Sequence, residues 1–391
     1  MKNIIIIGGG SSGLSTAYEL SKLIDKNEYQ IIILEKSYCG AAQTGQCCGF
    51  IRNYYNVREM AFSASESYKR IKKMSEYSED LALVRKGLLV FDNIKNKESM
   101  LENIAMLQSL GIEVEYLEGE KIKNLFPGIN HHNSCIAYDK NASYLNPLHL
   151  VKYLVKKVKE KGVIIRENTT VLDIKESKSG FSIATSTGEI KGAKVVNTTA
   201  ASTNQINAML GFNLPVKAIK INNSLYRVPI EVNQTGLAIA DFENLFYMIP
   251  HREFVDVSTI ALDLKKEVQA LSNGQFEFDH VFIEEYQEQL LRRLPHFKSA
   301  VSLGGFGSCI DITPDYYPII GRINNIPNYY CAAGFSGTGY KHFPIIGQLL
   351  AELILEINPS YPELVNFFAE SRLQQNILGR KGVSDSYFVK D

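Results

Sequence analysis

The chain has 391 residues, of which 45% are hydrophobic and 21% charged, so it has the composition of an ordinary globular protein and is long enough for two domains. Lysine plus arginine and aspartate plus glutamate each number 42, and this balance gives no support for nucleic acid or an anionic membrane surface as a partner. No run of about eighteen apolar residues occurs, so no membrane-spanning helix is expected.

Cysteine usage indicates the redox environment. The six cysteines include no C-x-x-C pair, and Cys47 and Cys48 are adjacent, which suits neither a zinc site nor a secreted disulfide framework. We therefore expect no metal and a reducing, cytoplasmic location. Lys2 and the isoleucines after it mimic a signal peptide, but the apolar run is too short and continues into a folded motif, so we expect no leader.

The first elements form a strand–helix–strand unit with a glycine-rich turn. An isoleucine run at 4–7 predicts a buried strand, residues 8–13 read G-x-G-x-x-G, a helical pattern follows, and a second strand at 31–34 ends in Glu35. The glycines allow the tight turn, the approach of backbone to a pyrophosphate and close helix–strand contact. The helix N-terminus offers N–H groups to phosphate, and Glu35 stands where it can accept hydrogen bonds from ribose hydroxyls. The unit therefore predicts a dinucleotide site.

The next hundred residues alternate between loop and helix. Residues 37–52 are small, polar and without periodicity, which predicts a loop. Asn146 and Pro147 start a later helix, because asparagine is a good N-cap and proline fits the first turn. Between that loop and this helix, the pattern predicts a helix at 58–74, a strand at 87–91, a helix at 100–110, short mixed elements at 114–126 and a loop-rich stretch at 127–143.

The second half is richer in strands. A buried strand at 194–199 is followed by a helix from about Ser202. A helix at 282–294 and a turn-rich connection at 313–321 precede a last buried strand at 329–333, a glycine-rich loop and an amphipathic helix. Short strands are predicted at 163–166, 170–176, 180–186 and 189–191, and then, in the antiparallel manner, at 218–221, 224–228, 237–240, 245–249 and 255–261.

These segments predict two interleaved domains. We expect one nucleotide-type domain assembled from residues 1–90, 145–212 and 316–391. We expect the β-rich substrate domain to be assembled from residues 91–144 and 213–315.

Two late segments are specific motifs: Thr313, Pro314 and Asp315 with the segment 318–321, and the glycine-containing segment 332–337. With the opening glycine turn, they resemble the D-amino-acid-oxidase-like FAD enzymes, in particular sarcosine oxidase, glycine oxidase and the flavin subunits of heteromeric sarcosine oxidases and L-proline dehydrogenases. The resemblance implies an α/β plus α+β fold, with a Rossmann-like FAD domain of the glutathione-reductase type and a second domain on a large, mostly antiparallel sheet. It also implies oxidation of a C–N bond by hydride transfer to flavin N5, which gives an imine.

The opening motif and the resemblance together predict the cofactor site. Reduced flavin is anionic near N1, and the helix that begins near Gly339 can place positive potential there. The resemblance implies that backbone at Val171 pairs with adenine. The expected FAD-binding residues are Gly8, Gly10, Ser11, Ser12, Gly13, Glu35, Lys36, Thr44, Gly45, Val171, Thr199, Gly334, Phe335, Ser336, Gly337, Thr338, Gly339, Tyr340 and Lys341.

The resemblance also implies substrate-site residues. An amino-acid carboxylate needs a fixed cation, best a bidentate guanidinium. Arg52 matches the family's carboxylate-binding arginine, Lys341 its second cation, and Tyr247 an aromatic residue that lines the substrate cavity. His251 and His342 lie near the predicted site by sequence and receive no firm role.

Several positions depart from the family pattern. Ser308 stands where some members attach FAD covalently through cysteine, and Cys309 is one residue late, so we expect non-covalent FAD. Ser258 stands where monomeric oxidases carry an oxygen-activating lysine, although Lys265 and Lys266 are near. Gln46 stands where relatives often have Arg or Asn. Ala200 stands where they usually have Gly. FMN at a subunit boundary is possible but not predicted, because no clear attachment histidine occurs near residues 141–149.

We therefore predict an FAD-dependent oxidase or dehydrogenase of a small amino, N-alkyl or cyclic amino acid such as sarcosine, glycine or proline. The electron acceptor is oxygen, a quinone or a partner flavoprotein, and a homo- or hetero-oligomer is possible. Two alternatives stay open. A 2-hydroxy-acid oxidase or dehydrogenase on the same fold would need His251 or His342 as a base. An electron-transferring flavoprotein subunit would act only within a heteromeric dehydrogenase.

Overall fold

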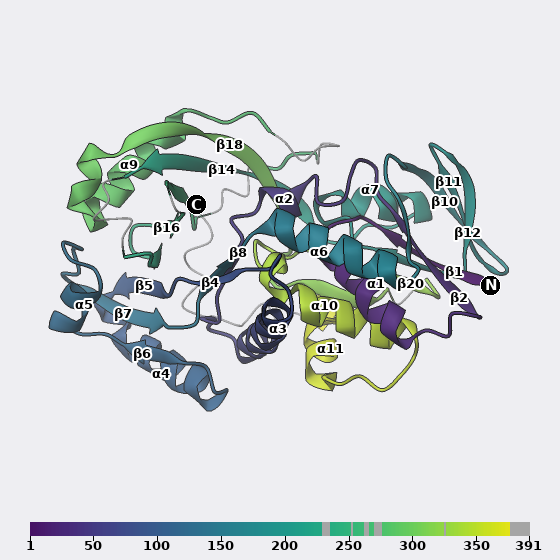
Figure 1. The fold of residues 1–391 in the computed structure, drawn as a ribbon, viewed down its shortest axis with the longest axis horizontal. Coiled ribbons are helices and arrows are strands. Elements are labelled where there is room, and N and C mark those ends of the chain that lie inside the picture. The colour runs from purple at the N-terminus through teal and green to yellow at the C-terminus, as the bar shows by residue number, and fades with distance from the viewer. Residues whose placement is uncertain (229–234, 252, 262–265, 270–275, 324–325, 376–391) are drawn as a thin grey trace.

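The computed structural model describes residues 1–375 apart from 229–234, 252, 262–265, 270–275 and 324–325. Two large sheets dominate it, one at each end of the long axis (Figure 1). The first has six strands in the order β19-β20-β13-β1-β2-β9, parallel except for β19. Their bounds are β1 Lys2–Ile7, β2 Tyr29–Leu34, β9 Ile164–Arg166, β13 Lys194–Asn197, β19 Ile319–Arg322 and β20 Tyr329–Ala333.

Both faces of this six-stranded sheet are covered, which explains why β1 reads as an unbroken isoleucine run. Ile4 and Ile6 face the helical side, whereas Ile5 and Ile7 face a three-stranded sheet and α7. The helical side comprises α1 Ser11–Leu23, α3 Arg58–Glu76, α6 Pro147–Glu160, α10 Gly339–Ile354 and α11 Pro362–Phe368. The other side comprises β10 Val171–Ser177, β11 Gly180–Thr185, β12 Gly188–Gly192 and α7 Thr203–Asn207.

The second large sheet has eight strands in the order β18-β14-β17-β16-β15-β5-β7-β6. Its pairings are antiparallel except for β15 with β5. Helix α9 (Val281–Arg293) packs on one face through a second core, and the other face turns toward the first sheet. The strands are β5 Leu88–Asn93, β6 Val114–Tyr116, β7 Ser134–Asp139, β14 Lys217–Arg227, β15 Ala238–Asp241, β16 Phe246–Pro250, β17 Val255–Thr259 and β18 Val301–Ile312.

Short elements join the two large sheets. The stretch predicted as a loop at 37–52 contains α2 and β3, and β3 pairs with β8, which pairs in turn with β4. Helix α4 packs on β6 and β7 at the outer edge (Figure 1). The bounds are α2 Gln43–Gln46, β3 Phe50–Ile51, β4 Leu83–Arg85, α4 Lys97–Ser109, α5 Glu120–Leu125 and β8 Ser143–Leu145.

Two local predictions were wrong: the loop-rich stretch at 127–143 contains β7, and the predicted pair of runs at 218–228 is the single strand β14. Strand β18 was not predicted, and the helix expected from about Ser202 is present as the five-residue α7. Strands β14 and β18 carry internal Asn, Ser and Gly residues, which favour turns locally. Pairing of the two strands with each other overrides that preference.

The strand pairings bear on the predicted domains. All strands of the six-stranded sheet come from 1–90, 145–212 and 316–391, and those of the eight-stranded sheet come from 91–144 and 213–315 except for the first residues of β5. The division into domains itself stays a prediction. Within the described residues, no helix combines the length and apolarity needed to cross a bilayer.

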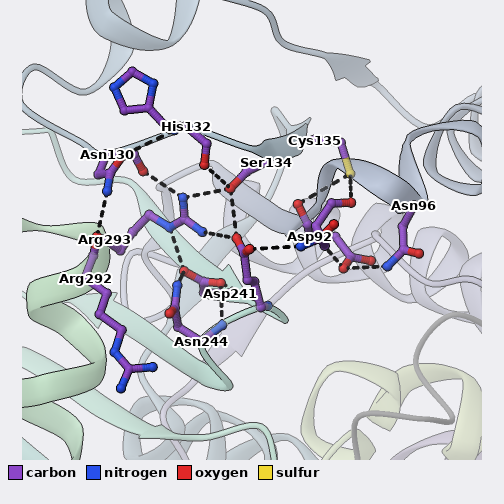
Figure 2. A network of polar contacts seen from close by, with 12 residues as sticks. Asp92, Asn96, Asn130, His132, Ser134, Cys135, Asp241, Asn244, Arg292 and Arg293 are labelled. Atoms are coloured by element: carbon purple, nitrogen blue, oxygen red, sulfur yellow. Dashed lines mark hydrogen bonds and ion pairs between the residues drawn. The ribbon is translucent and has the colours of Figure 1, made fainter.

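A buried ion pair fastens α9 to the eight-stranded sheet. The Arg293 side chain is 3% exposed, and its Nε donates to Oδ2 of the fully buried Asp241 at 2.6 Å. Figure 2 shows the same guanidinium donating to the Asn130 carbonyl and to Ser134 Oγ, at 2.7 and 3.0 Å. Its carbon lies 4.1 Å from the centre of the Phe91 ring. The network therefore orients α9 on its face of the eight-stranded sheet.

Candidate active site

One cavity of about 440 Å³ lies between the carboxyl ends of the parallel strands and the open face of the eight-stranded sheet. Arg52 and Tyr247 line it, as does most of the predicted cofactor set. Segments that are far apart in the chain therefore meet at one place. The predicted cofactor residues on its wall are Gly8, Gly10, Ser11, Ser12, Glu35, Lys36, Thr44, Val171, Thr199, Phe335, Ser336, Gly337, Thr338, Gly339, Tyr340 and Lys341.

Gly13, Gly45 and Gly334 do not line the cavity and lie behind its wall. A Cβ on Gly13 would meet the Gly8 carbonyl oxygen at 2.0 Å, and one on Gly45 would meet the Gly40 carbonyl oxygen at 2.3 Å. Both glycines allow close packing of backbone, and for Gly13 this is the third role that the opening motif predicts.

The Glu35 carboxylate is fixed by backbone at the end of β2. Its Oε2 accepts a hydrogen bond from the Gly9 N–H at 2.8 Å, and its Oε1 accepts one from the Ser37 N–H at 2.9 Å. A carboxylate has about four lone-pair positions, so both oxygens keep capacity for further donors. Lys36 lies beside Ser202, and burial lowers the pKa of Lys36.

The loop that begins at Gly334 is fastened by Asp311, a residue that the sequence analysis missed. Asp311 Oδ2 accepts hydrogen bonds from the backbone N–H groups of Gly334 and Phe335, at 2.6 and 3.2 Å. Gln43 Nε2 donates to Asp311 Oδ1 at 3.2 Å and so ties the loop to α2. Only the position of Asp311, just before the Thr313, Pro314 and Asp315 motif, signals its importance in the sequence.

Arg52 is a cation held in place by its neighbours. Its Nη1 donates to the Tyr54 carbonyl, and its guanidinium carbon lies 4.1 Å from the centre of the Tyr55 ring. The backbone N–H groups of Asn53 and Tyr54 donate to Oδ2 of the buried Asp139, at 2.7 and 3.2 Å. Asp139 lies on β7, within the stretch predicted as loop, so this support was not predicted.

Lys341 provides a second cation from the first turn of α10. The residue is 7% exposed, and its Nζ donates to the Gly337 carbonyl at 3.3 Å. Burial, and then the charge of nearby Arg52, lower the pKa of Lys341 to about 8. Neither cation forms an ion pair with a carboxylate anywhere in the described chain. A half-buried guanidinium and a buried ammonium on one cavity wall, neither in an ion pair with a described carboxylate, favour an anionic ligand.

The two histidines named from the sequence do not line the cavity. His342 is buried, with Nδ1 2.9 Å from Ser63 Oγ and Nε2 3.1 Å from the Tyr55 hydroxyl. Burial, reinforced by Lys341 and Arg52, holds the pKa of His342 well below its usual range, so the ring is neutral. Burial also lowers the pKa of His251 to about 4.

A model of the family described as FAD dependent oxidoreductase matches residues 3–353. The chain belongs to this family. FAD is the cofactor of the family.

Individual relatives agree with this assignment. Dimethylglycine dehydrogenase, mitochondrial, of Rattus norvegicus is 22% identical over 377 residues, which cover 91% of this chain but only 43% of the relative. This chain therefore spans less than half the length of that relative. Peroxisomal sarcosine oxidase of Homo sapiens is 25% identical, with 91% and 93% covered. The crystal structure of L-proline dehydrogenase from P. horikoshii shares the fold with a TM-score of 0.84 at 24% identity, covering 96% of this chain and 98% of the other.

The residues present fit FAD on the evidence of two helix N-termini. Helices α1 and α10 pack against each other, and both begin at the cavity wall. Neither has a side-chain cap or an acidic residue in its first turn, so each presents backbone N–H groups and a partial positive charge. The α1 end lies at the glycine turn beside Glu35, where a pyrophosphate next to a ribose would bind. The α10 end would serve the anionic reduced flavin.

The departures from the family pattern have structural consequences. Ser308 Oγ donates to Gln46 Oε1 at 2.7 Å, so the two unusual residues contact each other. Ala200 has φ +48°, a conformation that favours glycine, and it lines the cavity. Ser258 also lines the cavity, whereas the Lys266 ammonium lies over the Phe282 ring at 4.6 Å. Lys265 lies outside the described residues.

Proposed function

We propose that the protein oxidises the C–N bond of a small amino, N-alkyl or cyclic amino acid of the sarcosine, glycine or proline type. The observation that carries this proposal is the pair of cations, the half-buried Arg52 and the buried Lys341, on the wall of the cavity that the predicted FAD-binding elements form. A planar guanidinium beside an ammonium matches a carboxylate. The fold alone would not choose this substrate class.

The residues have distinct roles in this proposal. Arg52 and Lys341 hold the substrate carboxylate, and Tyr247 covers the bound molecule within the cavity. FAD, when bound, supplies the hydride acceptor. The amine must lose its extra proton first, because the nitrogen lone pair forms the new C=N bond as hydride leaves the α-carbon. Positioning and exclusion of water therefore account for most of the expected rate enhancement.

The names of the relatives support the same substrate class, since they describe enzymes of dimethylglycine, sarcosine and L-proline. The 2-hydroxy-acid alternative has less support, because neither His251 nor His342 lines the cavity to act as a base. Ser258 in place of a lysine favours a dehydrogenase that passes electrons to a quinone or a partner flavoprotein over an oxidase that uses oxygen. An oligomer with such a partner is part of the proposal.

Anaerobic mixing tests the proposal. The protein is loaded with FAD and mixed with sarcosine, glycine, L-proline, D-proline and lactate while the visible flavin absorbance is followed. We expect at least one amino acid to bleach the flavin and lactate to leave it oxidised. Bleaching by lactate alone would favour the hydroxy-acid alternative. No bleaching by any amino acid, in a preparation that binds FAD, would contradict the proposal.

A further inference from the structure

We propose that the cavity contains a subsite for the nitrogen end of the substrate, in which Asn223 accepts a hydrogen bond from the substrate N–H and Asp256 orients Asn223 and supplies negative potential. The inference rests on the proposed function and extends it from the carboxylate to the amine. Neither residue was singled out by the sequence analysis. Both lie in strands of the eight-stranded sheet.

Strand register places the subsite on the cavity wall. Asn223 of β14 is opposite Ser258 of β17, which is opposite Tyr247 of β16, and all three line the cavity. Asp256 precedes Ser258 by two residues on β17, so both side chains lie on the same face of the sheet. The intervening Val257 belongs to the core beneath α9, on the other face.

Hydrogen bonding determines how Asn223 is turned. Its Nδ2 donates to Asp256 Oδ1 at 2.8 Å and approaches the Tyr247 hydroxyl at 3.5 Å. A carboxylate only accepts hydrogen bonds, so the NH₂ group of Asn223 must face Asp256. The amide oxygen is then left as an acceptor. No other group in the described part of the chain donates to it.

Asp256 is a buried charge without a cation. The residue is 3% exposed, and no Lys, Arg or His forms an ion pair with it among the residues that the structure describes. Burial raises the pKa of Asp256 to about 6, so the group is still mostly ionised at neutral pH. A buried carboxylate with a single neutral donor is costly, and an approaching cation relieves that cost.

The cavity thus has two cations on its wall and a carboxylate behind Asn223, and none of the three forms an ion pair within the described residues. Arg52 and Lys341 match a carboxylate, and Asp256 with Asn223 matches an ammonium or secondary amine. As hydride leaves the α-carbon, the nitrogen becomes the positive end of an iminium, and fixed negative potential behind Asn223 stabilises that charge. The substrate class is therefore an amino acid with an N–H, in preference to a hydroxy acid or a plain carboxylic acid.

Isosteric ligand pairs test the subsite directly. Butyrate differs from sarcosine, and cyclopentanecarboxylate from L-proline, by CH₂ in place of NH. Dissociation constants are measured on the FAD-loaded protein, from perturbation of the flavin spectrum for the acids and from the concentration dependence of flavin reduction or perturbation for the amino acids. In the wild type, each amino acid should bind at least about tenfold more tightly than its isostere, the gain expected from a charge-assisted hydrogen bond.

Asp256→Asn should remove most of that preference, weakening the amino acids about tenfold and changing the isosteres less than about twofold. Asn223→Ser should do the same by withdrawing the acceptor, and it provides a second test if Asp256→Asn does not fold. Asp279→Asn, which removes an equal charge from an exposed residue at the start of α9, is the control and should keep the preference. Asp256→Glu, which keeps the charge, should retain part of the preference for the amino acid over its isostere.

The outcomes separate the two proposals. An unchanged ratio of amino acid to isostere in both Asp256→Asn and Asn223→Ser overturns the subsite, even if amino acids reduce the wild-type flavin. An equal loss for amino acid and isostere also overturns it, because the change is then structural. Absence of flavin reduction by every amino acid overturns the proposed function, whatever the ratio of dissociation constants.

Discussion

At the scale of single residues, the candidate site depends on two cations that reach the cavity from different directions. Arg52 comes from the segment after β3 and is held by Tyr54, Tyr55 and the buried Asp139. Lys341 comes from α10 and carries a lowered pKa because it is buried close to Arg52. The guanidinium remains charged at any accessible pH, whereas the ammonium can lose its proton near neutrality.

Arg52→Ala should raise KM for the amino-acid substrate by about 10- to 100-fold, because it removes a charge-assisted pair of hydrogen bonds to the carboxylate. The limiting rate of flavin reduction should change less. Steady-state kinetics with rapid-mixing measurements checks both values. Arg52→Lys keeps the charge but loses the planar, bidentate geometry of the guanidinium. Its KM should lie between those of the wild type and Arg52→Ala. An unchanged KM in Arg52→Ala would remove the residue from the carboxylate site.

Lys341 should make carboxylate binding depend on pH. Its pKa is about 8 in the ligand-free protein, so the ammonium is present below that pH and is lost as the pH rises through it. The Kd of butyrate, which has no titrating amine, should therefore increase above about pH 8, by up to tenfold per pH unit. Spectral titration of the FAD-loaded protein between pH 6 and pH 10 measures it. Lys341→Met should bind butyrate more weakly, and its Kd should not rise above pH 8. If the Kd still rises in this variant, the pH dependence belongs to another group.

At the scale of elements, α9 packs on the eight-stranded sheet, on the face that points away from the cavity. Its Arg293 forms a buried network with Asp241 and the loop around Asn130 (Figure 2). Breaking a buried ion pair leaves an uncompensated charge, which is the costly case. The apolar core beneath α9 includes Val255 and Val257, the neighbours of Asp256 on β17, so loss of this packing would also disturb the cavity.

Arg293→Met should lower the free energy of unfolding by about 3–5 kcal/mol, because Asp241 would remain buried without its partner. Chemical denaturation followed by circular dichroism measures this change. Arg292→Met is the matched control, since Arg292 is adjacent on the same helix but exposed, and it should change the stability by less than about 0.5 kcal/mol. Similar values for the two variants would mean that the buried pair contributes nothing specific.

At the scale of the whole molecule, the cavity exists only because the two large sheets lie together. Residues from both sheets form its wall, so a ligand there binds the native state and not the unfolded chain. In the proposed arrangement, the helix N-termini and Glu35 would hold one end of FAD, and Arg52 with the eight-stranded sheet would form the substrate side.

FAD should therefore stabilise the apoprotein by about 2.7 kcal/mol at a free concentration of 100 times its Kd, which thermal unfolding detects as a higher Tm. FMN, which lacks the adenosine that Glu35 would bind, should give a smaller shift at the same concentration. Acid precipitation of the loaded protein should release the flavin, since Ser308 replaces the attachment cysteine. A colourless protein whose Tm is unaffected by FAD would contradict the cofactor site.

The amino-acid sequence by itself determined the cofactor half of the site. The isoleucine run of β1, the glycine turn, Glu35 and the apolar strand before Gly334 are local signals, because turn geometry and helix N-termini depend on residues close together in the chain. The resemblance to a known family added Arg52, Lys341 and Tyr247, and the structure places all three on the same cavity as the cofactor residues.

Only the tertiary structure decided what surrounds these residues. Asp139 supports the Arg52 segment from β7, and Asp256 orients Asn223 across β14 and β17, through contacts between residues 33 to 86 positions apart. Strand β7 lies in a stretch predicted as loop, and β14 has an internal Asn-Asn-Ser run that favours a turn in isolation. Both are continuous strands because distant partners satisfy their backbone hydrogen bonds. Register across a sheet is set by all of its strands together, so no single stretch of sequence contained it.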